Sequence, residues 1–148
     1  MTLVEFLTAR LDEDEQVARW AIQYSGLRDR GLAESWEVVR TGEEGRSLLI
    51  QTRYEALRSK PVTEFYDAAF HRPLADHIAR HDPARVLREV EAKRRLVERY
   101  ERAVSQSASV SQYIRGQDHG YEEACRDALH DAAAVYSDHP DYREEWRP

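Results

Sequence analysis

Cysteine occurs only once in this chain of 148 residues, at Cys125, so no disulfide can form within it. A single cysteine fits a reducing compartment, and we expect the protein to be cytoplasmic. Long apolar runs are also missing, since none approaches the roughly 20 residues that a membrane-spanning helix needs. The first residues lack the basic start and apolar centre of a signal peptide. The sequence therefore predicts no membrane partner.

Glycine is scarce and scattered, and no glycine-rich phosphate loop of the Walker or dinucleotide type is present. The sequence also lacks the G-x-S-x-G, H-E-x-x-H and Cys-x-x-Cys motifs of common hydrolases and metal sites. The formal net charge of −6 argues against a surface that is basic overall, as nucleic-acid binding would require. These absences favour a protein without a cofactor and without catalytic activity.

The apolar residues that are present follow helical spacing in several segments and β-strand spacing in others. We predict the α+β class, with a small antiparallel sheet of two or three strands packed by three to four helices, one of them long and central. The chain length fits a single domain over residues 1–148. Its predicted parts are an N-terminal helix, a β-hairpin with a third strand, a helix pair that includes the long helix, and a C-terminal helix with an aromatic tail: 1–26, 34–67, 72–107 and 118–148.

Local signals indicate where several elements begin. Thr2 and Glu5 have the T-x-x-E spacing of a capping box and start a helix whose predicted apolar face includes Val17. Two segments rich in β-branched and aromatic residues, 35–40 and 47–53, flank the sequence TGEEGR and predict the hairpin. We expect Trp36 and Val38 to share one face of its first strand, and Leu48 and Ile50 to share one face of its second.

The middle of the chain carries a third strand candidate and two helices. Pro61 is expected at the start of an edge strand, because proline cannot donate to a sheet ladder. Residues 72–81 are predicted as a short helix with Pro73 in its first turn. The Asp-Pro pair at 82–83 supplies a preferred N-cap and a preferred first helical residue. A long helix should follow, from residue 83 to about residue 106.

Two histidines, His77 and His81, are four residues apart, and this spacing can present two imidazoles to one metal ion. Zinc would need further ligands, and Cys125 is the first choice. Other side chains of the right type are Asp76, Asp82, His119 and His130. The cap at Asp82 would end the shorter helix near His81. The alternative is therefore that both histidines lie at a helix junction and do not bind a metal ion.

A histidine in the sequence SDHPDY, His139, is flanked by Asp138 and Asp141. Neighbouring carboxylates raise the basicity of an imidazole, so an acid–base role is one interpretation. The alternative is a structural one, in which Asp138 or His139 caps a short turn opened by Pro140.

Arginines gather on one side of the predicted long helix, away from its valines: Arg85, Arg88, Arg95, Arg99 and Arg102. Such a stripe fits the phosphates of a nucleic acid or an acidic protein. Glu91 and Glu98 each precede one of these arginines by four residues, which is the spacing of ion pairs on a solvated helix face. Because the chain is acidic overall, nucleic acid is the less favoured partner.

The aromatic tail is the second candidate for interaction. Tyr142 and Trp146 are expected on one side of a last turn, where they dock on the domain or contact a partner. The N-terminal helix is expected to pack on the long helix of its own chain or, alternatively, on the same helix of a second copy, which would make a homodimer.

Three blocks of the sequence resemble one known family. They are LVEFLTARLDEDE at 3–15, HIARHDPARVLREVEAKRR at 77–95 and YSDHPDYREEW at 136–146, with Ser137 where the family has alanine. The chain is similar to the small actinobacterial and actinophage proteins of the DUF6221 family of unknown function. The resemblance implies an actinobacterial or phage source, which agrees with the excess of arginine (20) over lysine (2). Many members carry extra cysteines with zinc-ribbon-like spacing, whereas this chain has only Cys125.

We therefore expect a small accessory protein that is associated with a phage or prophage and acts by protein–protein interaction. The alternatives are a metal-binding or hydrolytic module centred on His77, His81 and Cys125, and a nucleic-acid adaptor that uses the arginine stripe.

Overall fold

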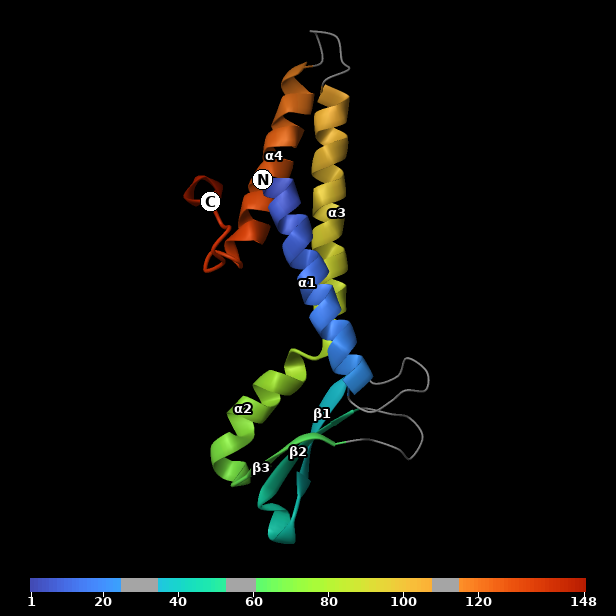
Figure 1. Cartoon of the computed structure of the whole chain (residues 1–148), viewed down its shortest axis with the longest axis vertical. Coiled ribbons are helices and arrows are strands. Elements are labelled where there is room, and N and C mark those ends of the chain that lie inside the picture. The colour runs from blue at the N-terminus through green and yellow to red at the C-terminus, as the bar shows by residue number, and fades with distance from the viewer. Residues whose placement is uncertain (25–34, 53–60, 108–114) are drawn as a thin grey trace. The chain divides into compact units, whose positions relative to one another are not determined.

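The structure, a computed structural model, describes residues 1–24, 35–52, 61–107 and 115–148 (Figure 1). The described part contains α1 (Leu3–Tyr24), β1 (Trp36–Thr41), β2 (Ser47–Thr52), β3 (Pro61–Tyr66), α2 (Ala68–Arg80), α3 (Pro83–Ser107) and α4 (Arg115–Ala134), with short 3-10 helices η1 (Glu43–Gly45) and η2 (Glu144–Trp146). The predicted α+β class with a small antiparallel sheet and one long helix is confirmed. The predicted end of the first helix at residue 26 lies outside the described residues. Among the helices that are described, none has the length and apolar character that crossing a bilayer requires.

The chain forms two compact units. Unit 1 comprises residues 1–13 and 89–148, and unit 2 comprises residues 14–88. Because both boundaries fall inside helices, α1 and α3 each contribute residues to both units. The expectation that residues 1–148 behave as one domain stays a prediction.

The sheet of unit 2 has the strand order β1-β2-β3 with antiparallel pairing throughout. Val38 lies opposite Ile50, and Leu48 lies opposite Phe65, so these side chains share one face of the sheet. Leu48 and Ile50 are fully buried, and α2 packs on this face with Ala68 and Ala75 in the same apolar cluster as Trp36. The predicted faces of the hairpin are confirmed, and so is Pro61 at the start of an edge strand.

Helix α2 begins earlier than the sequence analysis predicts. Its N-cap is Asp67, whose Oδ1 accepts a hydrogen bond from the backbone N–H of Phe70 at 3.3 Å. The helix therefore starts at Ala68, and Pro73 lies inside it instead of in its first turn. Proline is a preferred residue for a helix start, but the cap at Asp67, six residues before Pro73, decides where this helix begins.

The predicted cap of the long helix is confirmed. Oδ1 of Asp82 accepts a hydrogen bond from the backbone N–H of Arg85 at 2.8 Å. The other carboxylate oxygen, Oδ2, accepts from the backbone N–H of Trp36 at 3.2 Å. One side chain therefore starts α3 and also holds the first residue of β1.

The core of unit 1 gathers the start of α1, the end of α4 and the C-terminal tail. Phe6, Ala133 and Trp146 are buried together, and the rings of Phe6 and Trp146 are 4.9 Å apart between centroids. The tail thus docks on the domain as predicted. Reciprocal hydrogen bonds between Thr2 and Glu5 confirm the capping box at the start of α1.

Polar contacts join the helices of unit 1. Asp12 of α1 forms an ion pair with Arg94 of α3 at 2.6 Å, which agrees with the expectation that α1 packs on the long helix of its own chain. The Tyr100 side chain of α3 raises the pKa of Arg126 on α4, so these two side chains lie near each other. Figure 1 shows α3 and α4 running in opposite directions.

Val17 differs from its prediction. Helical spacing predicts it on the apolar face of α1, but its residue surface is 62% exposed, whereas Leu7 and Leu11 are fully buried. Helical spacing predicts which residues share a face, but only the neighbouring elements decide how far along the helix this face is covered.

Candidate functional site

The face of α2 that points away from the sheet carries exposed apolar side chains. It consists of Phe70, Leu74, His77 and His81, which we call the α2 stripe. The spacings of four, three and four residues put these side chains on one side of the helix. The opposite side carries the alanines that bury α2 against the sheet, Ala68, Ala75 and Ala79. Phe70 is 78% exposed and Leu74 is 48% exposed, which is unusual for a helix that already buries its other side.

The two histidines of the α2 stripe lie against each other at the end of the helix. Their ring centroids are 4.3 Å apart, and Nδ1 of His81 donates a hydrogen bond to the backbone carbonyl of His77 at 2.8 Å. His81 is also the C-cap of α2. The helix-junction alternative is therefore a sufficient account of the pair.

The proposed metal ligands are not assembled by either unit itself. Within the described ranges, no group of three or more His, Cys, Asp or Glu side chains is placed to hold a metal ion. Cys125 is half-buried on α4 in unit 1, and the histidine pair belongs to unit 2. His130, another candidate ligand, hydrogen-bonds the backbone carbonyl of Trp146 through Nδ1 at 2.9 Å and thus anchors the tail.

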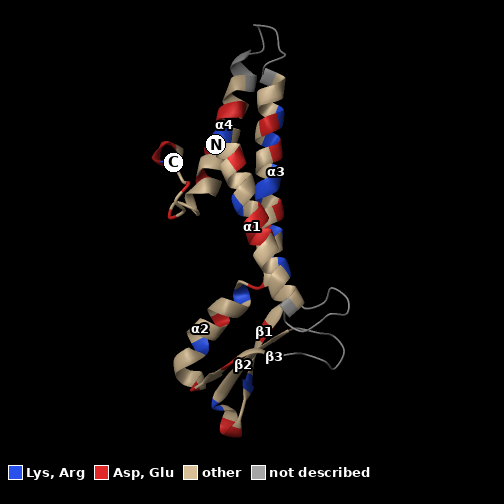
Figure 2. Ribbon diagram, in the orientation of Figure 1, with Lys and Arg blue, Asp and Glu red and all other residues tan. Residues whose placement is uncertain are grey.

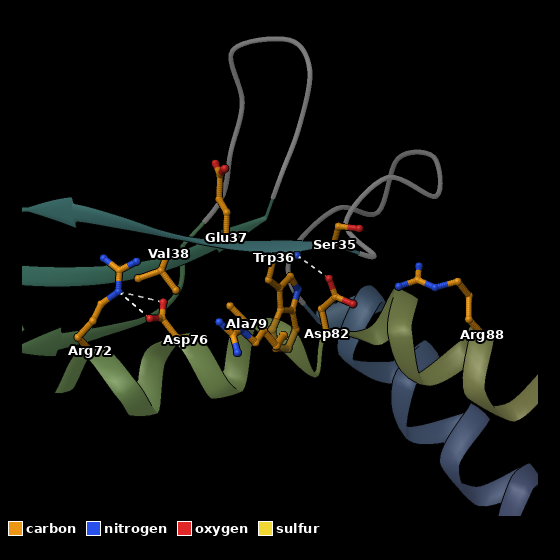
Figure 3. A pocket seen from close by; sticks show the side chains of 10 residues that line it. Ser35, Trp36, Glu37, Val38, Arg72, Asp76, Ala79, Asp82 and Arg88 are labelled. Atoms are coloured by element: carbon orange, nitrogen blue, oxygen red, sulfur yellow. Dashed lines mark hydrogen bonds and ion pairs between the residues drawn. The ribbon is translucent and has the colours of Figure 1, made fainter.

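A polar cavity of about 490 Å³ lies between β1, α2 and the start of α3 (Figure 3). Arg72 and Asp76 form an ion pair on its α2 side, with both carboxylate oxygens 2.9 Å from Nε. This hydrogen bond and the carboxylate charge raise the pKa of Arg72. Asp82 lines the other end, and the exposed side chains of Arg80 and Arg88 complete the charged lining.

The indole of Trp36 forms part of the cavity wall and lies beneath β1, between Asp76 and Asp82 (Figure 3). Its Nε1 is buried and has no hydrogen-bond acceptor within the described part of the chain. The same residue lines a second, apolar cavity of about 310 Å³ that it shares with Val17 and Val86. Trp36 therefore separates a charged cavity from an apolar one.

These two surfaces were missed by the sequence analysis for different reasons. The α2 stripe was detectable, because Phe70 and Leu74 continue the spacing of the two histidines toward the N-terminus. The cavity was not, because Trp36, Arg80 and Arg88 belong to three separate elements and form no sequence motif. Only the fold of unit 2 brings them together.

The arginines predicted to form a stripe lie on α3, where basic and acidic positions alternate along the ribbon (Figure 2). Arg95 forms the predicted ion pair with Glu91 at 2.7 Å. The corresponding pair of Glu98 with Arg102 is not formed, although both residues are described. Arg99 and Arg102 are exposed, whereas Arg85 is half-buried. A role for this stripe in binding nucleic acid or protein stays a prediction.

The surroundings of His139 fit the structural alternative. Its Nδ1 accepts a hydrogen bond from the backbone N–H of Asp141 at 3.1 Å, which closes the turn that contains Pro140. Its Nε2 is in contact with the guanidinium of Arg10. Both ring nitrogens are thus engaged within unit 1. Of the predicted tail residues, Tyr142 is half-buried and Trp146 is only 5% exposed.

Comparison with known proteins adds one finding. The profile of a family of unknown function (DUF6221) matches residues 1–148, which is the whole chain. No curated protein and no solved structure matches it.

Proposed function

For a chain that belongs to the DUF6221 family of unknown function, we propose a non-enzymatic accessory role that is carried out by protein–protein contact at the α2 stripe. One observation carries the proposal: α2 is apolar on two opposite sides, and among the described residues only the alanine side packs on the sheet. The alanine side packs on the sheet, while Phe70 and Leu74 remain exposed. Exposed apolar side chains that are contiguous mark interaction surfaces.

The chemistry of the α2 stripe favours a partner helix. Spacings of four, three and four residues are those of a coiled-coil seam, in which each side chain fits between residues of a facing helix. The stripe from Phe70 to His81 extends over roughly 17 Å at the rise of an α-helix. We therefore propose an amphipathic helix of another protein as the occupant.

The experiment is co-purification with the tagged chain from an actinobacterial host after brief cross-linking, followed by binding measurements with the purified partner. The test variant is Phe70→Ser combined with Leu74→Ser. The control is Tyr121→Ser combined with Val135→Ser, which also removes two exposed apolar side chains but from other parts of the chain.

We expect the test variant to bind the partner about 30-fold more weakly or worse, because removing a central aromatic contact typically costs 2 kcal/mol or more. The control should bind like the wild type. Equal binding by the two variants would contradict a role for the α2 stripe. Recovery of the chain alone, together with self-association that the test variant abolishes, would replace the proposed partner by a second copy.

The setting that we propose is the cytoplasm of an actinobacterium, where the gene belongs to a phage or prophage. The excess of arginine over lysine and the single cysteine support this setting. The genes on either side of the coding sequence test it, since phage genes are expected there and a housekeeping operon would contradict it.

A further inference from the structure

The polar cavity of unit 2 presents two cationic groups that the described protein leaves without acceptors. Arg80 on α2 and Arg88 on α3 both line it, and neither guanidinium has a hydrogen-bond or ion-pair acceptor among the described residues. Figure 3 shows the side chain of Arg88 extending beside Asp82 at the end of the cavity. A guanidinium has five N–H donors in a fixed plane, which suits it to a carboxylate or a phosphate.

The acidic groups of the cavity are already occupied. Asp76 is paired with Arg72 through both oxygens. Asp82 accepts one backbone N–H with each oxygen, from Trp36 and from Arg85. The carboxylate of Glu37 points away from α2, on the other side of β1 (Figure 3). Asp76 offsets the charge of Arg72, but the N–H donors of Asp82 are neutral amides and leave its negative charge in place. Arg80 and Arg88 therefore exceed the carboxylate of Asp82 by one positive charge at this site.

We propose that this cavity binds a carboxylate group, with Arg80 and Arg88 as the cationic groups of its lining that attract it. A carboxylate suits the cavity better than a phosphate, because the second charge of a phosphate would be repelled by the carboxylates of Asp76 and Asp82 nearby. The indole Nε1–H of Trp36, which has no acceptor in the wall, is a third donor beside this position. The volume of about 490 Å³ admits a side chain or a chain terminus and not only a bare ion.

Two kinds of ligand carry such a carboxylate: a free small acid, and a peptide with an acidic side chain. This proposal is independent of the proposed function, because the α2 stripe faces away from the sheet whereas the cavity lies beside it.

The experiment follows the indole Nε1–H signal of Trp36 by ¹H–¹⁵N NMR, with the signal identified by its loss in Trp36→Phe. The probes are acetate, the peptide acetyl-Gly-Asp-Gly-amide and its neutral counterpart acetyl-Gly-Asn-Gly-amide, all at a constant ionic strength set with sodium chloride. We expect acetate and the aspartyl peptide to give saturable shifts and the asparaginyl peptide to give none. Tighter binding of the peptide than of acetate would assign the source to a protein partner, and the reverse would assign it to a small acid.

Arg80→Gln combined with Arg88→Gln tests the two guanidiniums, and Arg95→Gln combined with Arg99→Gln, which also removes two arginines but from a part of α3 outside the cavity lining, is the control. Each arginine removed should weaken binding about tenfold, as expected for a charge-assisted hydrogen bond, and the control should bind like the wild type. If the double variant is unfolded, which a loss of chemical-shift dispersion would show, the single variant Arg88→Gln is tested in its place. Equal loss in the control, an identical shift with chloride alone, or tighter binding of inorganic phosphate would each overturn the assignment.

Phe70→Ser combined with Leu74→Ser should leave the acetate shift unchanged, so the failure of one proposal does not entail the failure of the other.

Discussion

Asp82 shows how much a single residue can contribute when each of its oxygens serves a different element. One oxygen caps α3, and the other accepts the backbone N–H of Trp36 at the start of β1. We expect Asp82→Ala to lower the free energy of unfolding by about 2 kcal/mol or more, since a lost N-cap and an unpaired backbone N–H each cost on the order of 1 kcal/mol.

The matched control is Asp82→Asn. Its amide oxygen still caps Arg85, whereas its amide nitrogen cannot accept from Trp36, so it should lose about half as much stability as the alanine variant. Urea denaturation measures both losses. An asparagine variant as unstable as the alanine variant would show that the contact to β1, and not the cap, accounts for the whole effect.

Glu5 offers a prediction that depends on pH. The hydrogen bond from the backbone N–H of Thr2 is the main reason why the pKa of Glu5 lies below 4.5. A carboxyl whose pKa is lower in the folded state stabilises the fold above its unfolded pKa, and this stabilisation is lost as the pH falls through the folded pKa. Glu5→Gln keeps an accepting oxygen but does not titrate. We expect the wild type to be the more stable of the two at neutral pH, with the difference vanishing in acid; a difference independent of pH would contradict this.

At the scale of elements, the tail is the clearest case of a short segment with a large energetic role. Trp146 packs on Phe6 and Ala133, and His130 holds its backbone carbonyl. Trp146→Ala should lower the free energy of unfolding by about 3 kcal/mol or more, as large-to-small changes of buried aromatic residues do. Trp146→Phe fills part of the same space and should cost less. A loss below about 1 kcal/mol in the alanine variant would mean that the tail is only loosely attached.

The individual helices and strands also show which features could be predicted from the sequence. The capping box of Thr2 and Glu5 and the cap at Asp82 were predictable because each depends on residues three positions apart. The faces of the hairpin were predictable because strand side chains alternate. The sequence predicts the start of α2 too late because Pro73 is a strong helix-start residue, whereas the cap at Asp67 follows directly after the last residue of β3. The charged cavity was not predictable, since Trp36, Arg80 and Arg88 meet only through the packing of β1, α2 and α3.

At the scale of the whole molecule, the question is whether the two units unfold together. Since α1 and α3 each pass without interruption through both units, melting one unit would fray helices on which the other depends. We expect a single cooperative transition, in agreement with the single domain predicted from the sequence.

Two tryptophan variants test whether the two units unfold in a single transition. Trp20→Phe combined with Trp36→Phe leaves Trp146 as the reporter of unit 1, and Trp146→Phe leaves the two tryptophans of unit 2. Within each variant, the midpoints from fluorescence and from far-ultraviolet circular dichroism should coincide. Two separate transitions in the circular dichroism would instead show two domains.

The placement of the unit boundaries inside helices also has a consequence for how such a protein evolves. Unit 2 is a continuous stretch of the chain, residues 14–88, but a gene fragment that encodes it would begin and end in the middle of a helix. Recombination cannot graft this fragment onto another protein without cutting both helices, and it cannot join the two separate segments of unit 1 without replacing what lies between them. We therefore expect the two units to be inherited together, in agreement with the family profile, which matches residues 1–148.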